Sequence, residues 1–354
     1  MGVGTRRSAL TVVQFVAIVA ALVHDFVSGR ATKLIIDTDM DLDVDDVGAL
    51  CMAHALQDNG EAEIAAVVYN SGIPSGVGAI SVINHFYGRD EIPIGSFKGT
   101  FANHTYGKYN HDLVSSFPSP IKNYTQTPDA VTVYRAALAK APPQSVSIAS
   151  IGFMQNLAGL LDSKADHIST LSGYELVQEK VQLLAVMGGA YPSSHKSPEF
   201  NFNCGDKLMG SPFECRGKSN ETIEKMPKSV RVVFVGWELG VKVLVGAKLT
   251  QCAPSSNPCR RAFIDFLGEN ADRASWDLLT TLYAVRHNAT AMNCSEAGSG
   301  GRNFVNSTDN NNRWVNGTRG YHQRYLVLNP VDFSGAGVGA HIDDLLCQAP
   351  KRRP

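Results

Sequence analysis

The feature that most constrains the fold of this chain is the alternation of short apolar segments with segments of helical spacing. The predicted strands are residues 33–36, 64–69, 92–94, 146–150, 181–187 and 230–235, and the predicted helices are residues 47–57, 79–87, 130–139 and 156–161. Strands that alternate with helices form a mostly parallel sheet with helices on both faces. We therefore predict an α/β fold with an open, doubly wound, Rossmann-like sheet.

Two long polar stretches, residues 97–127 and 293–323, interrupt this alternation. Long segments without a regular pattern are usually surface insertions or loops around an active site. The composition does not change along the chain in a way that would mark a linker. We predict one domain, residues 30–354, with long loop insertions.

The N-terminal residues 1–29 have the pattern of a signal peptide. Arg6 and Arg7 precede an apolar stretch at residues 9–23, and small residues follow at 28–29. The apolar stretch is short for a membrane span, which favours a cleaved signal over an uncleaved anchor. We expect a mature protein without a membrane segment, either secreted or held in a vacuole or another compartment of the secretory pathway.

Sequons and cysteines agree with this compartment. Seven Asn-X-Ser/Thr sequons predict glycosylated surface loops, and they begin at Asn103, Asn123, Asn220, Asn288, Asn293, Asn306 and Asn316. The spacing of the seven cysteines does not fit a zinc site, so disulfides are expected in an oxidising compartment. From proximity along the chain, the predicted pairs are Cys204–Cys215, Cys252–Cys259 and Cys294–Cys347, with Cys51 left as a buried thiol.

The charge of the chain is balanced. Lys plus Arg number 32 and Asp plus Glu number 33, and aromatic residues are not interleaved with a basic stripe. Nucleic acids and anionic membrane surfaces attract proteins with a basic excess. Neither partner is expected here.

Residues 37–46, with the sequence DTDMDLDVDD, form an acidic run directly after the first predicted strand. In an open α/β sheet, ligands bind beyond the carboxyl ends of the strands. Carboxylates this close together need a cation or hydrogen-bond donors to remain ionised, and oxygen ligands suit calcium or magnesium. The alternative is a solvated acidic turn, but apolar segments flank the run on both sides.

Two other aspartate motifs do not fit this run. An EF-hand loop beginning at Asp37 would need Gly and Glu at its sixth and twelfth positions, where Leu42 and Gly48 stand. A haloacid-dehalogenase phosphatase would need Thr or Val where Asp41 stands. Neither class is expected.

The run resembles the N-terminal signature of the inosine-uridine preferring nucleoside hydrolases, in the branch with the pattern DTDxxxDxDDxxAL. Further segments resemble that family in the same order along the chain: IGFMQN at 151–156, VMGGA at 186–190, EFN at 199–201, VGWELG at 235–240 and WDLL at 276–279. The resemblance implies a calcium-dependent enzyme that hydrolyses the N-glycosidic bond of ribonucleosides, as a homodimer or homotetramer.

The resemblance also implies a metal site. Asp39, Asp46, Asp277 and the main-chain carbonyl of Ile151 would bind calcium; the family often has Thr at the last position, but a backbone ligand tolerates Ile. Asp39 would also be the general base that takes a proton from the attacking water, whose pKa the ion lowers. The other acids of the run would support these ligands.

The implied substrate-binding residues are Asp45, Asn70, Met187, Glu199, Asn201 and Trp276. Asp45 would accept a hydrogen bond from a ribose hydroxyl, and Glu199 and Asn201 would hold the 5′ and 3′ hydroxyls. Met187 would pack beside the sugar, and Asn70 is the nearest candidate for an Asn that the family carries after the second strand. Cleavage passes through a ribosyl cation, which these oxygen atoms would stabilise.

The chain departs from the family at the residue before Asp277. Many members have a histidine there to protonate the leaving base, whereas this chain has Trp276, which stacks on a base but does not donate a catalytic proton. The candidate acids are His104, His111 and His195 in predicted loops, although an ordinary surface role is more frequent for such residues.

Three functions fit these residues. The leading one is extracellular hydrolysis of ribonucleosides for salvage. A second is hydrolysis of another ribosyl compound, such as a modified nucleoside or nicotinamide riboside, whose base leaves easily. A third is calcium-dependent binding of ribose or a nucleoside without turnover, and the presence of the general base Asp39 argues against it.

Overall fold

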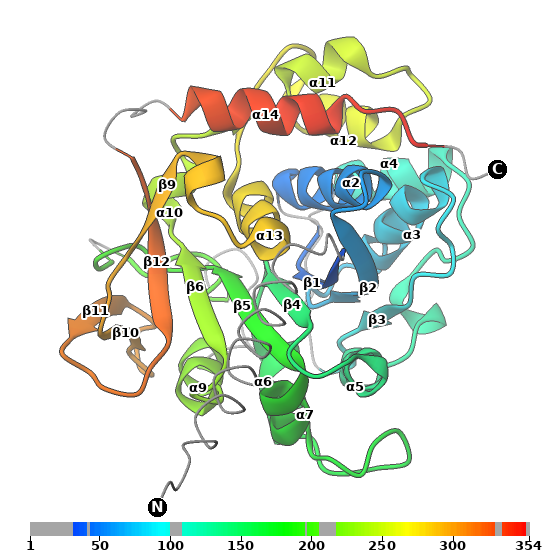
Figure 1. Cartoon of the computed structure of the whole chain (residues 1–354). Helices are drawn as coiled ribbons and strands as arrows, with labels where there is room; N and C mark the ends of the chain where they lie inside the picture. Colours follow the sequence, from blue (N-terminus) through cyan, green and yellow to red (C-terminus); the bar gives the residue numbers. More distant parts are fainter. Residues whose placement is uncertain are drawn as a thin grey trace, which may run out of the picture. The chain divides into compact units, whose positions relative to one another are not determined.

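An eight-stranded sheet organises the structure, which is a computed structural model describing residues 31–40, 43–99, 108–194, 197–204, 217–329 and 335–351. The strand order is β3-β2-β1-β4-β5-β6-β12-β9 (Figure 1). In chain order the strands are β1 (Thr32–Thr38), β2 (Ala62–Tyr69), β3 (Ile94–Ser96), β4 (Val146–Ser150), β5 (Val181–Met187), β6 (Arg231–Val235), β9 (Cys294–Ala297) and β12 (Gln323–Leu328). All neighbours pair in parallel except β12 and β9. The predicted open, mostly parallel sheet is confirmed.

Helices cover both faces of this sheet because its strands are apolar on both sides. In β1, Leu34 and Ile36 belong to one hydrophobic cluster and Ile35 to the other, since successive side chains of a strand point to opposite faces. The first cluster includes residues of α2 (Asp45–Asp58), α3 (Gly76–Phe86), α13 (Trp276–Arg286) and α14 (Ala336–Leu346). The second includes residues of α5 (Ala130–Lys140), α6 (Gln155–Asp162), α7 (Gly173–Lys180) and α9 (Lys218–Lys225). Figure 1 shows the two helical layers on opposite sides of the strands.

The two predicted loop insertions contain regular structure. The first holds α4 (Lys108–Ser116) and the short 3-10 helix η1 (Tyr124–Gln126), while its residues 100–107 lie outside the described residues. The second holds β9, which joins the main sheet, and a hairpin of β10 (Gly301–Val305) and β11 (Asn312–Asn316). Its strands are short and polar, so the period of their side chains did not stand out in the sequence.

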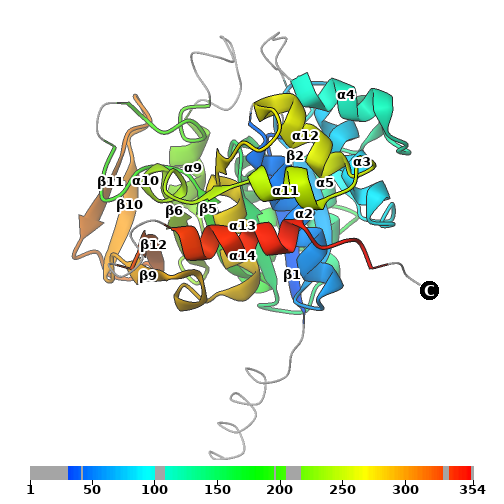
Figure 2. The ribbon, with the colours of Figure 1, turned by 90° about the horizontal axis from the view of Figure 1, so that it is seen from above.

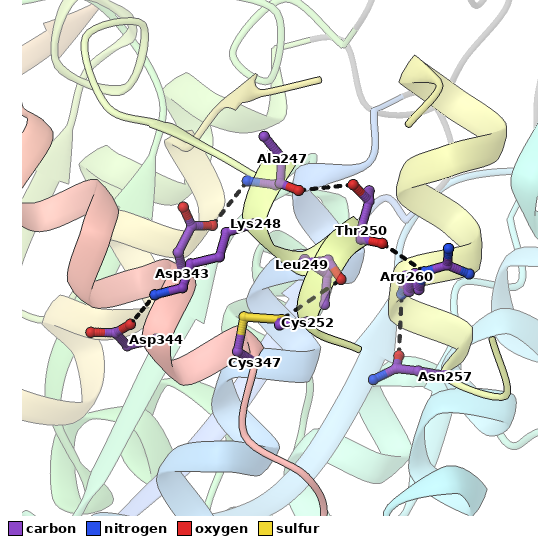
Figure 3. Close-up of a disulfide and its surroundings, with 11 residues drawn as sticks. Ala247, Lys248, Leu249, Thr250, Cys252, Asn257, Arg260, Asp343, Asp344 and Cys347 are labelled. Atoms are coloured by element: carbon purple, nitrogen blue, oxygen red, sulfur yellow. Dashed lines mark hydrogen bonds and ion pairs between the residues drawn. A yellow bond between two sulfur atoms is a disulfide. The ribbon is translucent and has the colours of Figure 1, made fainter. Parts of the chain in front are cut away.

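Two disulfides correct the predicted pairing. Cys51 of α2 is bonded to Cys259 of α12 (Pro258–Leu267), and Cys252 of α11 (Ala247–Cys252) is bonded to Cys347 at the end of α14. The predicted pairs Cys252–Cys259 and Cys294–Cys347 are therefore wrong, because two different helices lie against the two cysteines that are neighbours in sequence. Figure 3 shows the second bond, and Figure 2 shows α11 and α14 side by side.

The prediction that Cys51 is the buried thiol is also wrong. Cys294, not Cys51, is the buried thiol among the described residues, and its Sγ lies 3.3 Å from the carbonyl oxygen of Met292. Cys204 takes part in a disulfide, but its predicted partner Cys215 lies outside the described residues.

The predicted signal peptide, residues 1–29, lies outside the described residues as well. The contacts of the chain group Thr32–Pro354 in one unit. Within the described part of the chain, no helix has both the length and the apolar character that a bilayer span requires.

Candidate active site

A cavity of about 280 Å³ lies where β1, β4, β5 and β6 end at their carboxyl edges. All predicted site residues except Asn70 line this cavity, although they come from segments more than 200 residues apart. The lining residues are Asp39, Asp43, Asp45, Asp46, Ile151, Met187, Glu199, Phe200, Asn201, Trp237, Arg273, Trp276 and Asp277.

Three buried carboxylates form the floor of the cavity. Asp45 and Asp46 lie in the first turn of α2, and Asp277 lies in the first turn of α13, which packs against α2. Each offers an oxygen atom, and these atoms lie within 4.8 Å of one another. Helix N-termini favour negative charge, so both helices stabilise the acids that they carry. We call Asp45, Asp46 and Asp277 the acidic cluster.

Burial raises the pKa of each carboxyl in the acidic cluster well above its ordinary value, and the neighbouring aspartates raise it further. Burial also raises the pKa of Asp39 to about 8, with smaller contributions from Glu199 and Asp43. A bound cation favours the ionised form of carboxylates that would otherwise repel one another. Because all the side-chain donors are oxygen atoms, the site fits a hard divalent cation.

The supporting residues lie behind this floor. The Thr38 hydroxyl donates to Asp46 and accepts from the Met40 N–H at 3.1 Å. Asp37 is buried and accepts from Asn70 Nδ2 at 2.7 Å, from Asn156 Nδ2 at 3.0 Å and from the Tyr134 hydroxyl at 2.9 Å.

Asn70 does not reach the cavity. Its Nδ2 donates to Asp37, and its Oδ1 accepts from the Phe153 N–H at 3.1 Å. A Cβ atom at Gly152 would lie 2.5 Å from the Asp39 nitrogen and 2.8 Å from Asn70 Oδ1, so this turn requires glycine. Through its hydrogen bond to the Phe153 N–H, Asn70 thus stabilises the turn that follows Ile151.

Glu199 and Asn201 form another part of the cavity lining, which we call the sugar wall after the role predicted for both residues. Glu199 accepts from the N–H groups of Gly189 (3.0 Å), Asn201 (2.9 Å) and Phe202 (3.1 Å). Burial raises the pKa of Glu199 to about 7, although these N–H groups oppose the shift. The Asn201 amide donates to the Met187 carbonyl at 3.3 Å and lies 3.2 Å from its sulfur. Hydrogen bonds therefore link three of the predicted sugar-binding residues, Glu199, Asn201 and Met187.

Residues 34–316 match the sequence model of one protein family, described as inosine-uridine preferring nucleoside hydrolase. The chain belongs to this family. Its members are N-ribohydrolases that act on small ribonucleosides, so the predicted family and enzyme class are confirmed.

Solved structures share the fold of this nucleoside hydrolase at low identity. A plant nucleoside hydrolase is 16% identical, with a TM-score of 0.61 and coverage of 90% of this chain and 98% of that one. A purine-preferring ribonucleoside hydrolase from Gardnerella vaginalis is 15% identical, with a TM-score of 0.61 and coverage of 89% and 99%. The type III effector XopQ, solved with adenosine diphosphate ribose, is 14% identical, with a TM-score of 0.61 and coverage of 94% and 98%. A comparison with curated proteins found no match.

The mouth of this nucleoside hydrolase is built from aromatic rings and one ion pair. The Arg273 guanidinium donates to both carboxylate oxygens of Asp43, at 2.9 and 3.0 Å from Nε, and lies 5.3 Å from the centre of the Trp276 ring. Trp276 Nε1 donates to the Trp237 carbonyl at 2.9 Å. A Cβ atom at Gly240 would lie 2.0 Å from the Trp276 ring, so this contact requires glycine as well.

Four lining residues were not predicted as site residues: Asp43, which was expected only to support the ligands, and Phe200, Trp237 and Arg273. Phe200 and Trp237 stand inside the EFN and VGWELG motifs, so their place in those motifs was the available signal. Arg273 belongs to no motif; it contacts Trp276, three positions later, and Asp43, 230 positions earlier.

The predicted acids do not supply a proton donor in the described part of the site. His111 is exposed on α4 and does not line the cavity. His104 and His195 lie outside the described residues. No histidine is among the described residues that line the cavity.

Proposed function

We propose that this protein is a calcium-dependent hydrolase that splits extracellular ribonucleosides into base and ribose. The observation that carries the proposal is a single cavity lined both by the acidic cluster and by Glu199 and Asn201. A ribose in this cavity would meet cation-binding oxygens and hydrogen-bonding groups in the same lining.

Asp39, Asp46, Asp277 and the carbonyl of Ile151 would hold the calcium ion. Calcium accepts many oxygen ligands in a loose geometry, which suits carboxylates drawn from two helices and a strand end. A bound ion would lower the pKa of water and neutralise the floor.

Asp39 takes a proton from the attacking water at a carboxylate oxygen. It lines the same cavity as the acidic cluster and the sugar wall, and its charge interacts with that of Glu199. A place in the cavity lining suits a general base, which must reach the reacting atoms.

Asp45 of the acidic cluster, the sugar wall and Met187 surround the ribose, stabilise the ribosyl cation and orient its hydroxyls. Asp45 accepts from one ribose hydroxyl, Glu199 and Asn201 hold the 5′ and 3′ hydroxyls, and Met187 packs beside the ring. Negative and dipolar oxygen atoms fixed before the reaction stabilise charge that develops in the transition state. Asn70 contributes through Asp37 and the Phe153 N–H rather than by touching the sugar.

The base stacks on Trp276, with Trp237 at the edge of the same mouth. Large flat rings gain the most from stacking, so purine nucleosides are the expected substrates. A second candidate is hydrolysis of another ribosyl compound. The observation that favours it is the absence of histidine among the described cavity-lining residues, because a good leaving group needs no acid.

Several sequon asparagines are exposed, which supports a glycoprotein of the secretory pathway because glycans are attached at the protein surface. Asn288, Asn293 and Asn316 are exposed. Asn220 is half-buried and donates from Nδ2 to the Val305 carbonyl at 2.6 Å, so it is a poor acceptor for a glycan. Disulfides persist in such an oxidising compartment.

The test is base release by the mature protein from inosine, guanosine, adenosine and uridine, with calcium, with a chelator, and with calcium restored. We expect release from purine nucleosides that stops on chelation and returns with calcium. Ribose binding without release from any nucleoside would support the binding-protein alternative. Light scattering on the same sample distinguishes the expected dimer or tetramer from a monomer.

A further inference from the structure

We propose that Asn312, at the start of β11, is a positioning residue that sets the place of Glu199 in the sugar wall. The inference rests on the proposed function, because it concerns the carboxylate that would hold the ribose 5′ hydroxyl. Asn312 is buried and does not itself line the cavity. Its effect passes through the turn that follows β5.

The side chain of Asn312 uses its full hydrogen-bonding capacity. Oδ1 accepts from the Ala190 N–H at 2.9 Å and from the Ser194 hydroxyl at 2.7 Å. Nδ2 donates to the Ala190 carbonyl at 2.9 Å and to Asn303 Oδ1 at 3.1 Å. An amide has two donor hydrogens and two acceptor positions, so only a primary amide of this length satisfies all four partners.

These bonds fix both sides of Ala190, directly after the glycine that binds Glu199. The Gly189 N–H donates to Glu199 Oε2 at 3.0 Å, and Gly189 has a φ of +78°. A Cβ atom at Gly189 would lie 2.9 Å from Asn312 Cγ, so the amide packs directly against the turn. The direction of the Gly189 N–H therefore depends on the amide that holds the next residue.

The hairpin of β10 and β11 has other attachments that do not involve the Asn312 side chain. The Trp314 N–H donates to the Pro192 carbonyl at 2.7 Å, and the ring centres of Trp314 and Tyr325 lie 4.9 Å apart. Asn303 Nδ2 donates to the Tyr191 hydroxyl at 3.1 Å. Shortening Asn312 should therefore loosen the turn while the hairpin stays in place.

The experiment compares Asn312→Ala with the wild type on inosine and on 5′-deoxyinosine. The matched control is Asn220→Ala, which removes a bond to the same hairpin, at Val305, without touching the turn. We expect Asn312→Ala to lower kcat/KM on inosine about tenfold, the loss associated with one misplaced hydrogen bond to a charged group. The loss should shrink to about twofold on 5′-deoxyinosine, because the group that Glu199 holds is already missing. Asn220→Ala should change both substrates by less than about twofold.

Equal losses on the two substrates would overturn the inference, since they would show only a general loosening of the fold. If Asn312→Ala does not fold, Asn312→Asp replaces it, because this variant keeps the shape and the acceptor for Ala190 but loses the donor to its carbonyl. It should show the same dependence on the substrate.

A wild type that releases no base would contradict the proposed function separately. The inference would then be tested by calorimetric binding of ribose and 5-deoxyribose with calcium, with the same expected difference between them. A wild type that neither cleaves nucleosides nor binds ribose would contradict both the proposed function and the role of Asn312.

Discussion

The floor of the cavity and its mouth differ in burial and in the kind of side chain that forms them. The floor consists of carboxylates at least nine-tenths buried, each fixed in the first turn of a helix, and their oxygen atoms lie close enough together to hold a cation. The mouth consists of Trp276, which is half-buried, Trp237, which is 51% exposed, and an arginine paired with Asp43.

The difference shows why the two parts tolerate change unequally. A buried charge that loses its partner costs several kcal/mol, whereas a stacking ring that is partly exposed contributes about 1 kcal/mol. Variants of the floor should therefore abolish activity, and variants of the mouth should tune it.

The largest effect is expected at Asp277. Asp277→Ala removes a proposed calcium ligand, and kcat/KM should fall on the order of a thousandfold or more, because metal assistance contributes several kcal/mol to such reactions. The measurement is base release together with calcium binding by calorimetry. Asp162→Asn, in an exposed ion pair with Lys225, is the matched control and should leave both unchanged. Full activity in Asp277→Ala would remove the floor from the mechanism.

A smaller loss is expected for the proposed general base. Asp39→Asn keeps the size and one oxygen ligand but cannot take a proton, so kcat should fall about a hundredfold to a thousandfold at saturating calcium. Steady-state kinetics in calcium well above the dissociation constant separate this loss from weakened binding of the ion. A variant with wild-type kcat would show that another group accepts the proton.

Two other acids of the cavity lining, Asp39 and Glu199, should determine how stability depends on pH. The pKa of Asp39 is raised to about 8 and that of Glu199 to about 7, so the folded protein binds more protons than the unfolded chain between pH of about 4 and 8. Without calcium, the free energy of unfolding should therefore fall as the pH rises through this window. Calcium should offset the fall, so the gain in melting temperature on adding it should be larger at pH 8 than at pH 5. Thermal unfolding at the two pH values, with chelator or calcium, measures this difference; a gain independent of pH would contradict it.

The smallest effect is expected at the mouth. Trp276→Ala should lower kcat/KM for inosine about tenfold through lost stacking, and Trp276→Phe should recover part of that loss. Calcium affinity should stay the same in both variants, because Trp276 contributes no ligand. A thousandfold loss, or a loss of calcium, would mean that floor and mouth are not separate.

The part of the site that follows β1 could be predicted because its motif is local. Asp39, Asp45 and Asp46 follow a strand of apolar residues, and a parallel sheet brings the ends of its strands to one edge. Asp277 and Glu199 could be predicted as site residues only through the family resemblance. It failed for Asn70, which stands after β2 as expected but whose amide is bonded to Asp37 and the Phe153 N–H instead of facing the cavity.

The sequence by itself determined the six apolar strands of the sheet, the four helices between them and the acidic run after β1, because hydrophobic period and residue chemistry are properties of short segments. Only the tertiary structure decided which residues meet across long separations. It paired Cys51 with Cys259, placed Arg273 on Asp43 and set the Asn312 amide against Ala190. Such contacts depend on how helices and hairpins pack, and no local pattern in the chain encodes a partner that is more than 100 residues away.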